Sequence, residues 1–135
     1  MRALLLLLWI AGFLQVVMAS ANLFLPAKLN YRENLCRVSP IIRQIFVVHS
    51  VYIVDVVLMF AAVTFAFAGD LASGRGLGRF LAAAMAVFWL VRAPVQLLYY
   101  DAAVRRENRW GDIAFTTGAL FLAATYGAAS FAHGL

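Results

Sequence analysis

Charged residues are scarce in this sequence. Only 13% of its 135 residues are charged, whereas 65% are hydrophobic. Soluble domains average roughly 25% charged and 45–50% apolar residues. A soluble domain of this length could not cover its surface with so few polar groups. Soluble globular and disordered classes are therefore excluded, and the chain is predicted to be a small integral membrane protein with the lipid bilayer as its solvent.

Cysteine and histidine are also scarce. The single cysteine, Cys36, excludes an intramolecular disulfide and any Cys-x-x-Cys pair, and with them the thiol-relay membrane oxidoreductases. The two histidines, His49 and His133, lie near opposite membrane faces, which disfavours haem held by two axial histidines. No three or four ligands converge as zinc requires. We expect neither a cofactor nor a metal.

Positive charge exceeds negative charge, with a formal net charge of +5. In a soluble protein this excess would indicate nucleic acid as a partner. Here the basic residues lie in short segments between apolar runs, where they set topology and contact anionic lipid headgroups. Nucleic acid is therefore not expected as a partner.

Four long apolar runs dominate the chain, at about residues 3–25, 45–68, 80–100 and 113–131. Each approaches or exceeds the roughly 20 residues that cross a hydrocarbon core. Only helices and closed barrels satisfy their backbone groups in lipid, and these runs are too long and too continuously apolar for barrel strands. We predict an all-α membrane protein, with residues 1–135 forming a single domain of four transmembrane helices in an antiparallel bundle.

The first run has a second interpretation, because Val17-Met18-Ala19 before Ser20 resembles the cleavage site of a secretory signal. The run nevertheless stays apolar through Leu25, which suits a full span. Cleavage would also export the four basic residues that follow, against the positive-inside tendency. We expect a retained helix and keep cleavage as the alternative.

The basic residues also predict orientation. With the N-terminus outside, the cytoplasmic loops carry seven Lys and Arg residues and the opposite side carries three, which favours both termini outside. Several loop arginines are expected to contact anionic headgroups, namely Arg32, Arg37, Arg105, Arg106 and Arg109.

The loops contain recognisable helix and turn residues. Between the first two runs, Asn30 could cap a short amphipathic helix that lies at the membrane interface. Ser39-Pro40 predicts the start of the second long helix, and Asp112 could cap the fourth. The glycine-rich segment 74–78 resembles part of a phosphate cradle, but no strand precedes it, so a turn is favoured.

Two ionisable residues, Asp55 and Arg92, lie deep within predicted spans, where such groups are normally paired or face a cavity. At about 1.5 Å per residue, Asp55 lies roughly 15 Å and Arg92 roughly 12 Å from the same membrane face. The sequence therefore predicts an Asp55–Arg92 ion pair between neighbouring antiparallel helices.

Other polar side chains are predicted to gather in the same leaflet half. A larger cluster would join Asp55 and Arg92 to His49, Gln96, Gln15, Tyr52, Tyr99 and Tyr100. Such a cluster could be a structural network that holds the helices together. It could also line a polar pocket that binds a small ligand or headgroup, or relay protons. Both interpretations stay open at this point.

No catalytic arrangement stands out. Ser50, His49 and Asp55 are badly spaced on one helix for a nucleophile–base–orienter triad. We expect a non-enzymatic structural, accessory, small-ligand-binding or lipid-binding component; the alternative is a small transporter or proton-conducting subunit using Asp55, Arg92 and His49. A stripe of small residues, Ala119, Ala123 and Gly127, must pack closely within the bundle or against a partner chain, so a homo-oligomer or a larger membrane complex is considered.

Two segments resemble those of small four-helix membrane proteins from bacteria that have no assigned role. They are LPAKLNYRENLCRVSPIIRQIFVVHSVYIVD and FWLVRAPVQLLYYD. The resemblance implies four helices and a bacterial cytoplasmic membrane. It attaches no activity or cofactor, and it directs attention to His49, Arg92, Gln96 and Tyr100.

Overall fold

The computed structural model describes residues 1–28, 30–99, 106–107 and 109–132, without the side chains of residues 25–28, 31 and 99. Most of these residues are helical, and no strand occurs among them. Four long helices are apolar enough to span a membrane: α1 (Arg2–Lys28), α3 (Pro40–Ala66), α5 (Gly76–Pro94) and α7 (Arg109–Phe131). A π-helical turn, η1 (Val95–Tyr99), continues α5. The predicted all-α fold with four helices long and apolar enough to cross a membrane is confirmed.

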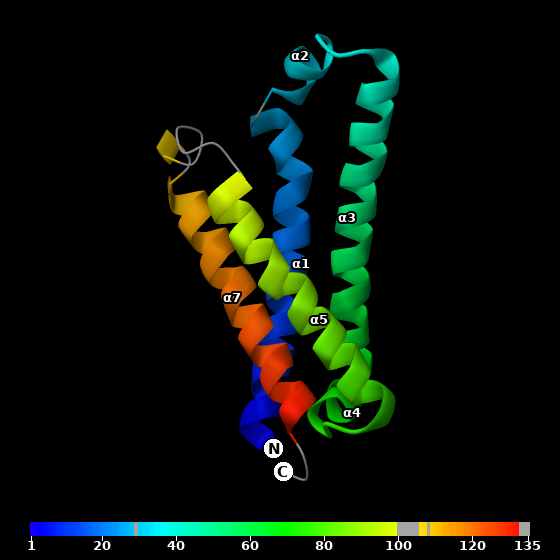
Figure 1. The fold of residues 1–135 in the computed structure, drawn as a ribbon, viewed down its shortest axis with the longest axis vertical. Helices are drawn as coiled ribbons and strands as arrows, with labels where there is room; N and C mark the ends of the chain where they lie inside the picture. The colour runs from blue at the N-terminus through cyan, green and yellow to red at the C-terminus, as the bar shows by residue number, and fades with distance from the viewer. Residues whose placement is uncertain (29, 100–105, 108, 133–135) are drawn as a thin grey trace.

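Successive long helices run in alternate directions (Figure 1). The short helix α4 (Ala68–Ala72) follows α3 at the end of the molecule where α1 begins and α7 finishes. The short helix α2 (Tyr31–Leu35) lies at the opposite end, between α1 and α3. We refer to these as the α4 end and the α2 end. That α2 lies in the membrane interface stays a prediction.

Two of the predicted helix caps, at Asn30 and Asp112, are wrong. Asn30 makes no side-chain cap; it adopts the left-handed conformation (φ 52°, ψ 48°), which asparagine tolerates and which turns the chain from α1 into α2. Asp112 does not cap the fourth span, because α7 already begins at Arg109. Pro40 does stand at the start of α3, as predicted, since its fixed φ suits the first helical turn.

The core lies toward the α4 end. Helix α5 packs chiefly against α7 and α1 against α3, while α1 also contacts α7 and the short α4 contacts all four long helices. The most deeply buried apolar side chains come from α1, α4, α5 and α7 and include Leu8, Ala11, Leu71, Ala72, Ala82, Ala119, Leu122 and Ala129. Many are alanines, which let helix backbones approach closely.

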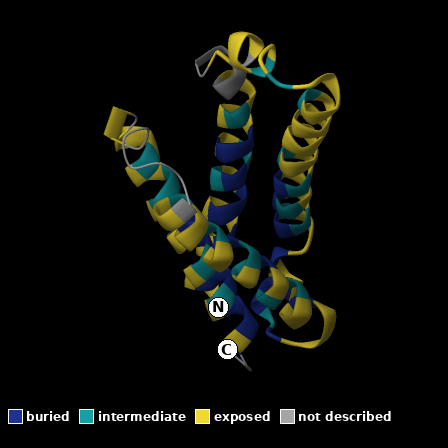
Figure 2. Ribbon diagram, turned by 45° about the horizontal axis from the view of Figure 1, so that its top comes forward, coloured by how far each residue is buried: buried dark blue, intermediate teal, exposed yellow. Residues whose placement is uncertain are grey.

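Toward the α2 end the helices separate. None of the residues of α3 from Pro40 to Val56 is buried, and the buried residues of this helix, Val57, Ala61 and Thr64, follow later. Figure 2 shows this change along α3, which is exposed near α2 and buried in its lower part. The bundle is therefore closed at the α4 end and open at the α2 end.

The glycine-rich segment is a packed turn, in line with the favoured interpretation. Gly74 has φ +62° and lies against the backbone of Ala132, so it joins the turn to the end of α7. Gly78, in the first turn of α5, lies directly against the backbone of α4, and a Cβ there would overlap the carbonyl oxygen of Asp70. Close contact between backbones accounts for the glycines at positions 74 and 78, so no phosphate site is needed to explain them.

Gly78→Ala is expected to destabilise the fold. The added methyl group meets main-chain atoms, which cannot move aside as a flexible side chain would, and overpacking of this kind costs about 1–3 kcal/mol. The midpoint of unfolding in detergent, followed by circular dichroism, measures the effect. Gly69→Ala is the matched control, because a Cβ there meets nothing within 4 Å. Equal midpoints for the two variants would contradict the close α4–α5 contact.

Candidate functional site

Tyr126 of α7 is fully buried, and its hydroxyl group contacts polar side chains from two other helices. Gln15 Nε2 of α1 donates to it at 2.5 Å, and Thr64 Oγ1 of α3 lies 2.6 Å from it. Thr64 donates its own proton to the carbonyl oxygen of Phe60 at 2.7 Å. Because a hydroxyl has one proton, the Tyr126 hydroxyl must donate to Thr64 and accept from Gln15.

The remaining long helix, α5, contributes Trp89. Its indole Nε1 donates to Gln15 Oε1 at 3.4 Å, and the amide nitrogen of Gln15 also donates to the carbonyl of Ala11 at 3.3 Å. Each of the four spans thus provides one side chain. We call Gln15, Thr64, Trp89 and Tyr126 the interhelical network.

The interhelical network satisfies its own polar atoms. Gln15, Thr64 and Tyr126 are 0% exposed and Trp89 is 2% exposed. In such surroundings a polar group without a partner is costly, whereas interhelical hydrogen bonds within membranes average about 0.6 kcal/mol and reach about 2. The network therefore acts structurally: it fixes the rotation and depth of each helix relative to the other three.

Sequence reasoning identified only one member of this network. Gln15 belongs to the predicted polar cluster, whereas Thr64, Trp89 and Tyr126 were missed because their importance depends on the contacts that they make with one another in the packed bundle. The small residues on either side of Gln15 were a sign in the sequence that its face of the helix is packed against other helices. Gln15 lies between Ala11 and Ala19, four residues to either side, on the buried stripe of α1.

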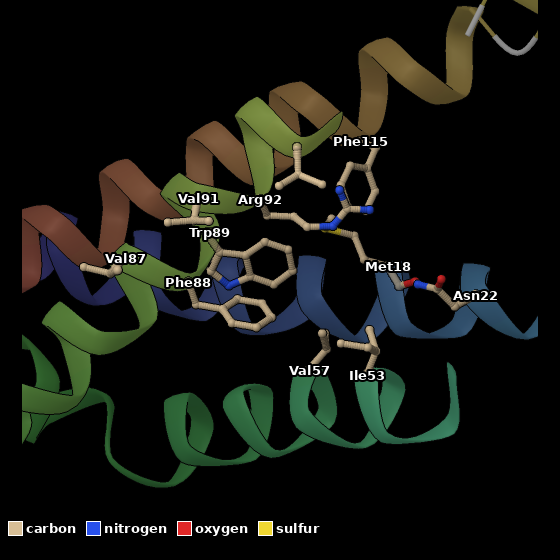
Figure 3. A pocket seen from close by; sticks show the side chains of 11 residues that line it. Met18, Asn22, Ile53, Val57, Val87, Phe88, Trp89, Val91, Arg92 and Phe115 are labelled. Atoms are coloured by element: carbon tan, nitrogen blue, oxygen red, sulfur yellow. The ribbon is translucent and has the colours of Figure 1, made fainter. Parts of the chain in front are cut away.

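Arg92 lines a cavity on the α2 side of the interhelical network. The cavity has a volume of about 400 Å³ and is bounded by Met18, Asn22, Ile53, Val57, Val87, Phe88, Trp89, Val91, Arg92, Val95 and Phe115. Figure 3 shows side chains from all four spans around it, with the guanidinium group of Arg92 beside the ring of Phe115. The Cζ atom of Arg92 lies 4.7 Å from the centre of that ring, a cation–π distance.

Aromatic packing and the network form the end of this cavity nearer α4. Phe88 packs edge-on against Phe60 of α3 and against Trp89, with ring centres 5.1 and 5.2 Å apart. Trp89 belongs to both features, since its ring lines the cavity while its N–H is bonded to Gln15. The network therefore positions one wall of the cavity, and on the described lining Arg92 is the only charged side chain.

The predicted Asp55–Arg92 ion pair is wrong. Asp55 is exposed and forms no hydrogen bond or ion pair with any residue that the structure describes. At about 100° per residue, Asp55 lies about 160° around α3 from Val57, which faces the core. Depth along the helix was estimated from the sequence, but the rotation of α3 about its axis is set by the buried stripe of Val57, Ala61 and Thr64.

His49 and Tyr52 lie apart from Arg92 as well. His49 is exposed, and its Nδ1 contacts only the carbonyl of Ile45, one turn earlier in α3, at 2.9 Å. Tyr52 is 65% exposed. Asp55 lies on the same exposed part of α3. Placing an ionisable side chain in hydrocarbon costs at least about 2.5–3.5 kcal/mol of insertion free energy, so an exposed Asp55 is unusual for a single chain in lipid.

The remaining predicted residues have separate positions. Gln96 in η1 donates to Asp112 Oδ1 of α7 at 2.8 Å, so this pair joins the α2 ends of two neighbouring helices. Tyr100 and Arg105 lie outside the described residues, as does the side chain of Tyr99. The other arginines that were predicted to contact headgroups are exposed, namely Arg32, Arg37, Arg106 and Arg109. Their contact with headgroups stays a prediction.

Comparisons with protein-family models, with curated proteins and with solved structures each gave no match. The site is therefore interpreted from its geometry.

Tyr126→Phe is expected to destabilise the protein by about 1–2 kcal/mol, because it removes the hydroxyl that Gln15 and Thr64 share. Unfolding in detergent, followed by circular dichroism, measures the change. Tyr52→Phe is the control, since it removes the same atom from an exposed tyrosine. Combining Tyr126→Phe with Thr64→Val should cost less than the sum of the two single changes, since both remove one bond. Equal effects of the two tyrosine changes would contradict the network.

Proposed function

We propose that the protein is a non-enzymatic membrane component that binds a small anionic amphiphile, a lipid or lipid-like molecule, in the cavity beside Arg92. The observation that carries the proposal is the make-up of the lining: apolar side chains from four helices surround one arginine and one asparagine. An anionic amphiphile has the complementary make-up, with one charged group and an apolar tail.

The dimensions and chemistry of the cavity support this ligand class. A volume of about 400 Å³ falls in the range of roughly 300–1,000 Å³ that is usual for small-molecule sites. The planar guanidinium group of Arg92 can donate two parallel hydrogen bonds to a carboxylate or phosphate. Asn22 faces the cavity from α1, although its amide nitrogen already donates to the carbonyl of Met18 at 2.9 Å.

The lining favours binding over chemistry. Among the eleven residues named above there is no serine, cysteine, histidine or carboxylate that could act as a nucleophile or general base. The open α2 half of the bundle offers a route from the bilayer, because α3 is not packed over its first turns. A lipid-like ligand could therefore enter sideways without crossing the membrane.

The proposed setting is the bacterial cytoplasmic membrane, with both termini outside. Seven basic residues lie between the first and second or between the third and fourth apolar runs of the sequence, against three in the other two polar segments, and this difference supports the orientation. It places the open end of the cavity in the cytoplasmic half of the bilayer. The resemblance to small bacterial four-helix proteins supports the choice of membrane.

Arg92→Gln is expected to weaken binding of a brominated fatty acid by at least about tenfold, because a charge-assisted hydrogen bond is lost. The readout is quenching of Trp89 fluorescence in detergent by dibromostearate, in a protein whose other tryptophans, the exposed Trp9 and Trp110, are changed to phenylalanine. Arg92→Lys should retain part of the affinity.

Two controls accompany that measurement. Arg79→Gln removes an exposed arginine near the α4 end, away from the cavity, and should leave quenching unchanged. A brominated monoacylglycerol tests the charge, since it has the same tail without the anion. Quenching that is equal for both lipids, or unaffected by Arg92→Gln, would reject the proposed ligand class.

The orientation has its own test, which uses the exposed Cys36 beside α2. In intact bacterial cells with a permeabilised outer membrane, a membrane-impermeant maleimide should not label Cys36 until the inner membrane is opened. With Cys36→Ser as background, a cysteine introduced at Arg75, in the turn at the α4 end, should be labelled at once. The reverse pattern would show that the termini are inside.

A further inference from the structure

Asp55 lies inside the hydrocarbon core for every placement of α3 across a bilayer. The helix Pro40–Ala66 has 27 residues, and a core about 30 Å thick takes about 20 of them. Whichever twenty consecutive residues cross the core, residues 47–59 are always among them. Asp55 and its neighbour Tyr52 therefore lie in apolar surroundings unless something covers them.

The two residues belong to an exposed stripe on the side of α3 away from the bundle. We define the outer face of α3 as Val48, Tyr52, Asp55, Met59 and Ala62, all of which are exposed. Their spacing alternates between four and three residues, which places them in one line along a helix. This is the spacing with which one helix packs against another.

Asp55 makes the outer face unsuitable for lipid. Its carboxylate has no hydrogen bond or ion pair among the described residues. Ionisable residues within membrane spans nearly always pair or face a protein interior. The side chain cannot reach its own core, because it points away from Val57 and Ile53, which line the cavity on the opposite side of α3 (Figure 3). The partner of Asp55 must therefore come from outside this bundle.

Charge decides what kind of helix fits. A second copy of the chain would present the same carboxylate at the same depth, and like charges repel in a medium of low polarity. Arg92, the other charged residue that the structure describes deep in a span, lines the inner cavity rather than an outer surface. A second copy thus offers no complementary charge to the outer face.

We propose that the outer face of α3 docks a transmembrane helix of a different protein, which carries an arginine or lysine at the depth of Asp55. An ion pair in the middle of the membrane would form at the centre of this contact, with Tyr52 as a neighbouring hydrogen-bond donor. The proposal concerns a surface separate from the Arg92 cavity, so each can fail without the other.

A designed peptide tests the proposal in zwitterionic lipid vesicles. The probe is a single-span leucine–alanine peptide with one arginine at its midpoint. Because Asp55 lies near the midpoint of α3, this arginine is at the depth of Asp55 whichever way the peptide crosses the membrane. The full chain carries a donor dye on Cys36, its one cysteine, and the peptide carries an acceptor. Energy transfer to the arginine peptide should reach half-saturation at a peptide-to-lipid ratio about tenfold lower than transfer to an all-leucine peptide.

Variants of the chain identify the residue responsible. Asp55→Asn should abolish the preference for the arginine peptide, and Asp55→Glu should retain it. Asp70→Asn, which neutralises an exposed aspartate in α4, should have no effect, and circular dichroism checks that all variants keep the wild-type helicity. Equal transfer to both peptides, or a preference that survives Asp55→Asn, would overturn the proposal. So would Asp55-dependent energy transfer between donor-labelled and acceptor-labelled copies of the chain without peptide, since a second copy would then occupy the face.

Discussion

The hydroxyl group of Tyr126 is the contact on which the rest of the structure depends. It accepts a hydrogen bond from Gln15 and donates one to Thr64, and Gln15 in turn accepts from Trp89. Apolar side chains give little directional preference within lipid, because packing against a helix and packing against acyl chains bury similar surfaces. Four polar groups with one consistent donor order favour the arrangement of helices in which all of their hydrogen bonds form. The network thereby sets which face of each helix points inward.

The two halves of the bundle follow from that constraint. On the α4 side of the network, alanines and the glycine at position 78 bring the backbones close together. On the α2 side the same rotation turns Val57 and Trp89 toward one another across a cavity and places Arg92 on its lining. It also turns Asp55 outward. A cavity with a cationic group and an outer face with an anionic group are thus two results of one helix arrangement.

Much of the architecture was predictable because it depends on local properties. The four spans were located by run length and composition, and Pro40 marked the start of α3. The site was predicted less well. Arg92 and Gln15 were recognised as functional or structural candidates, yet Asp55 was assigned to the wrong side of its helix. Depth along a helix can be counted from the sequence, whereas rotation about the helix axis depends on which small residues meet the neighbouring helices. Thr64, Trp89 and Tyr126 were missed because their importance comes from meeting one another.

The sequence by itself determined that the chain is helical and suited to a membrane, because apolar runs of this length have no other stable form in lipid. It also determined how deep each polar side chain lies, since the rise per residue is constant. The tertiary structure decided which of those side chains meet. Hydrogen bonds among Gln15, Thr64, Trp89 and Tyr126 join segments separated by up to 111 residues, and only the packed bundle brings such distant positions within bonding distance.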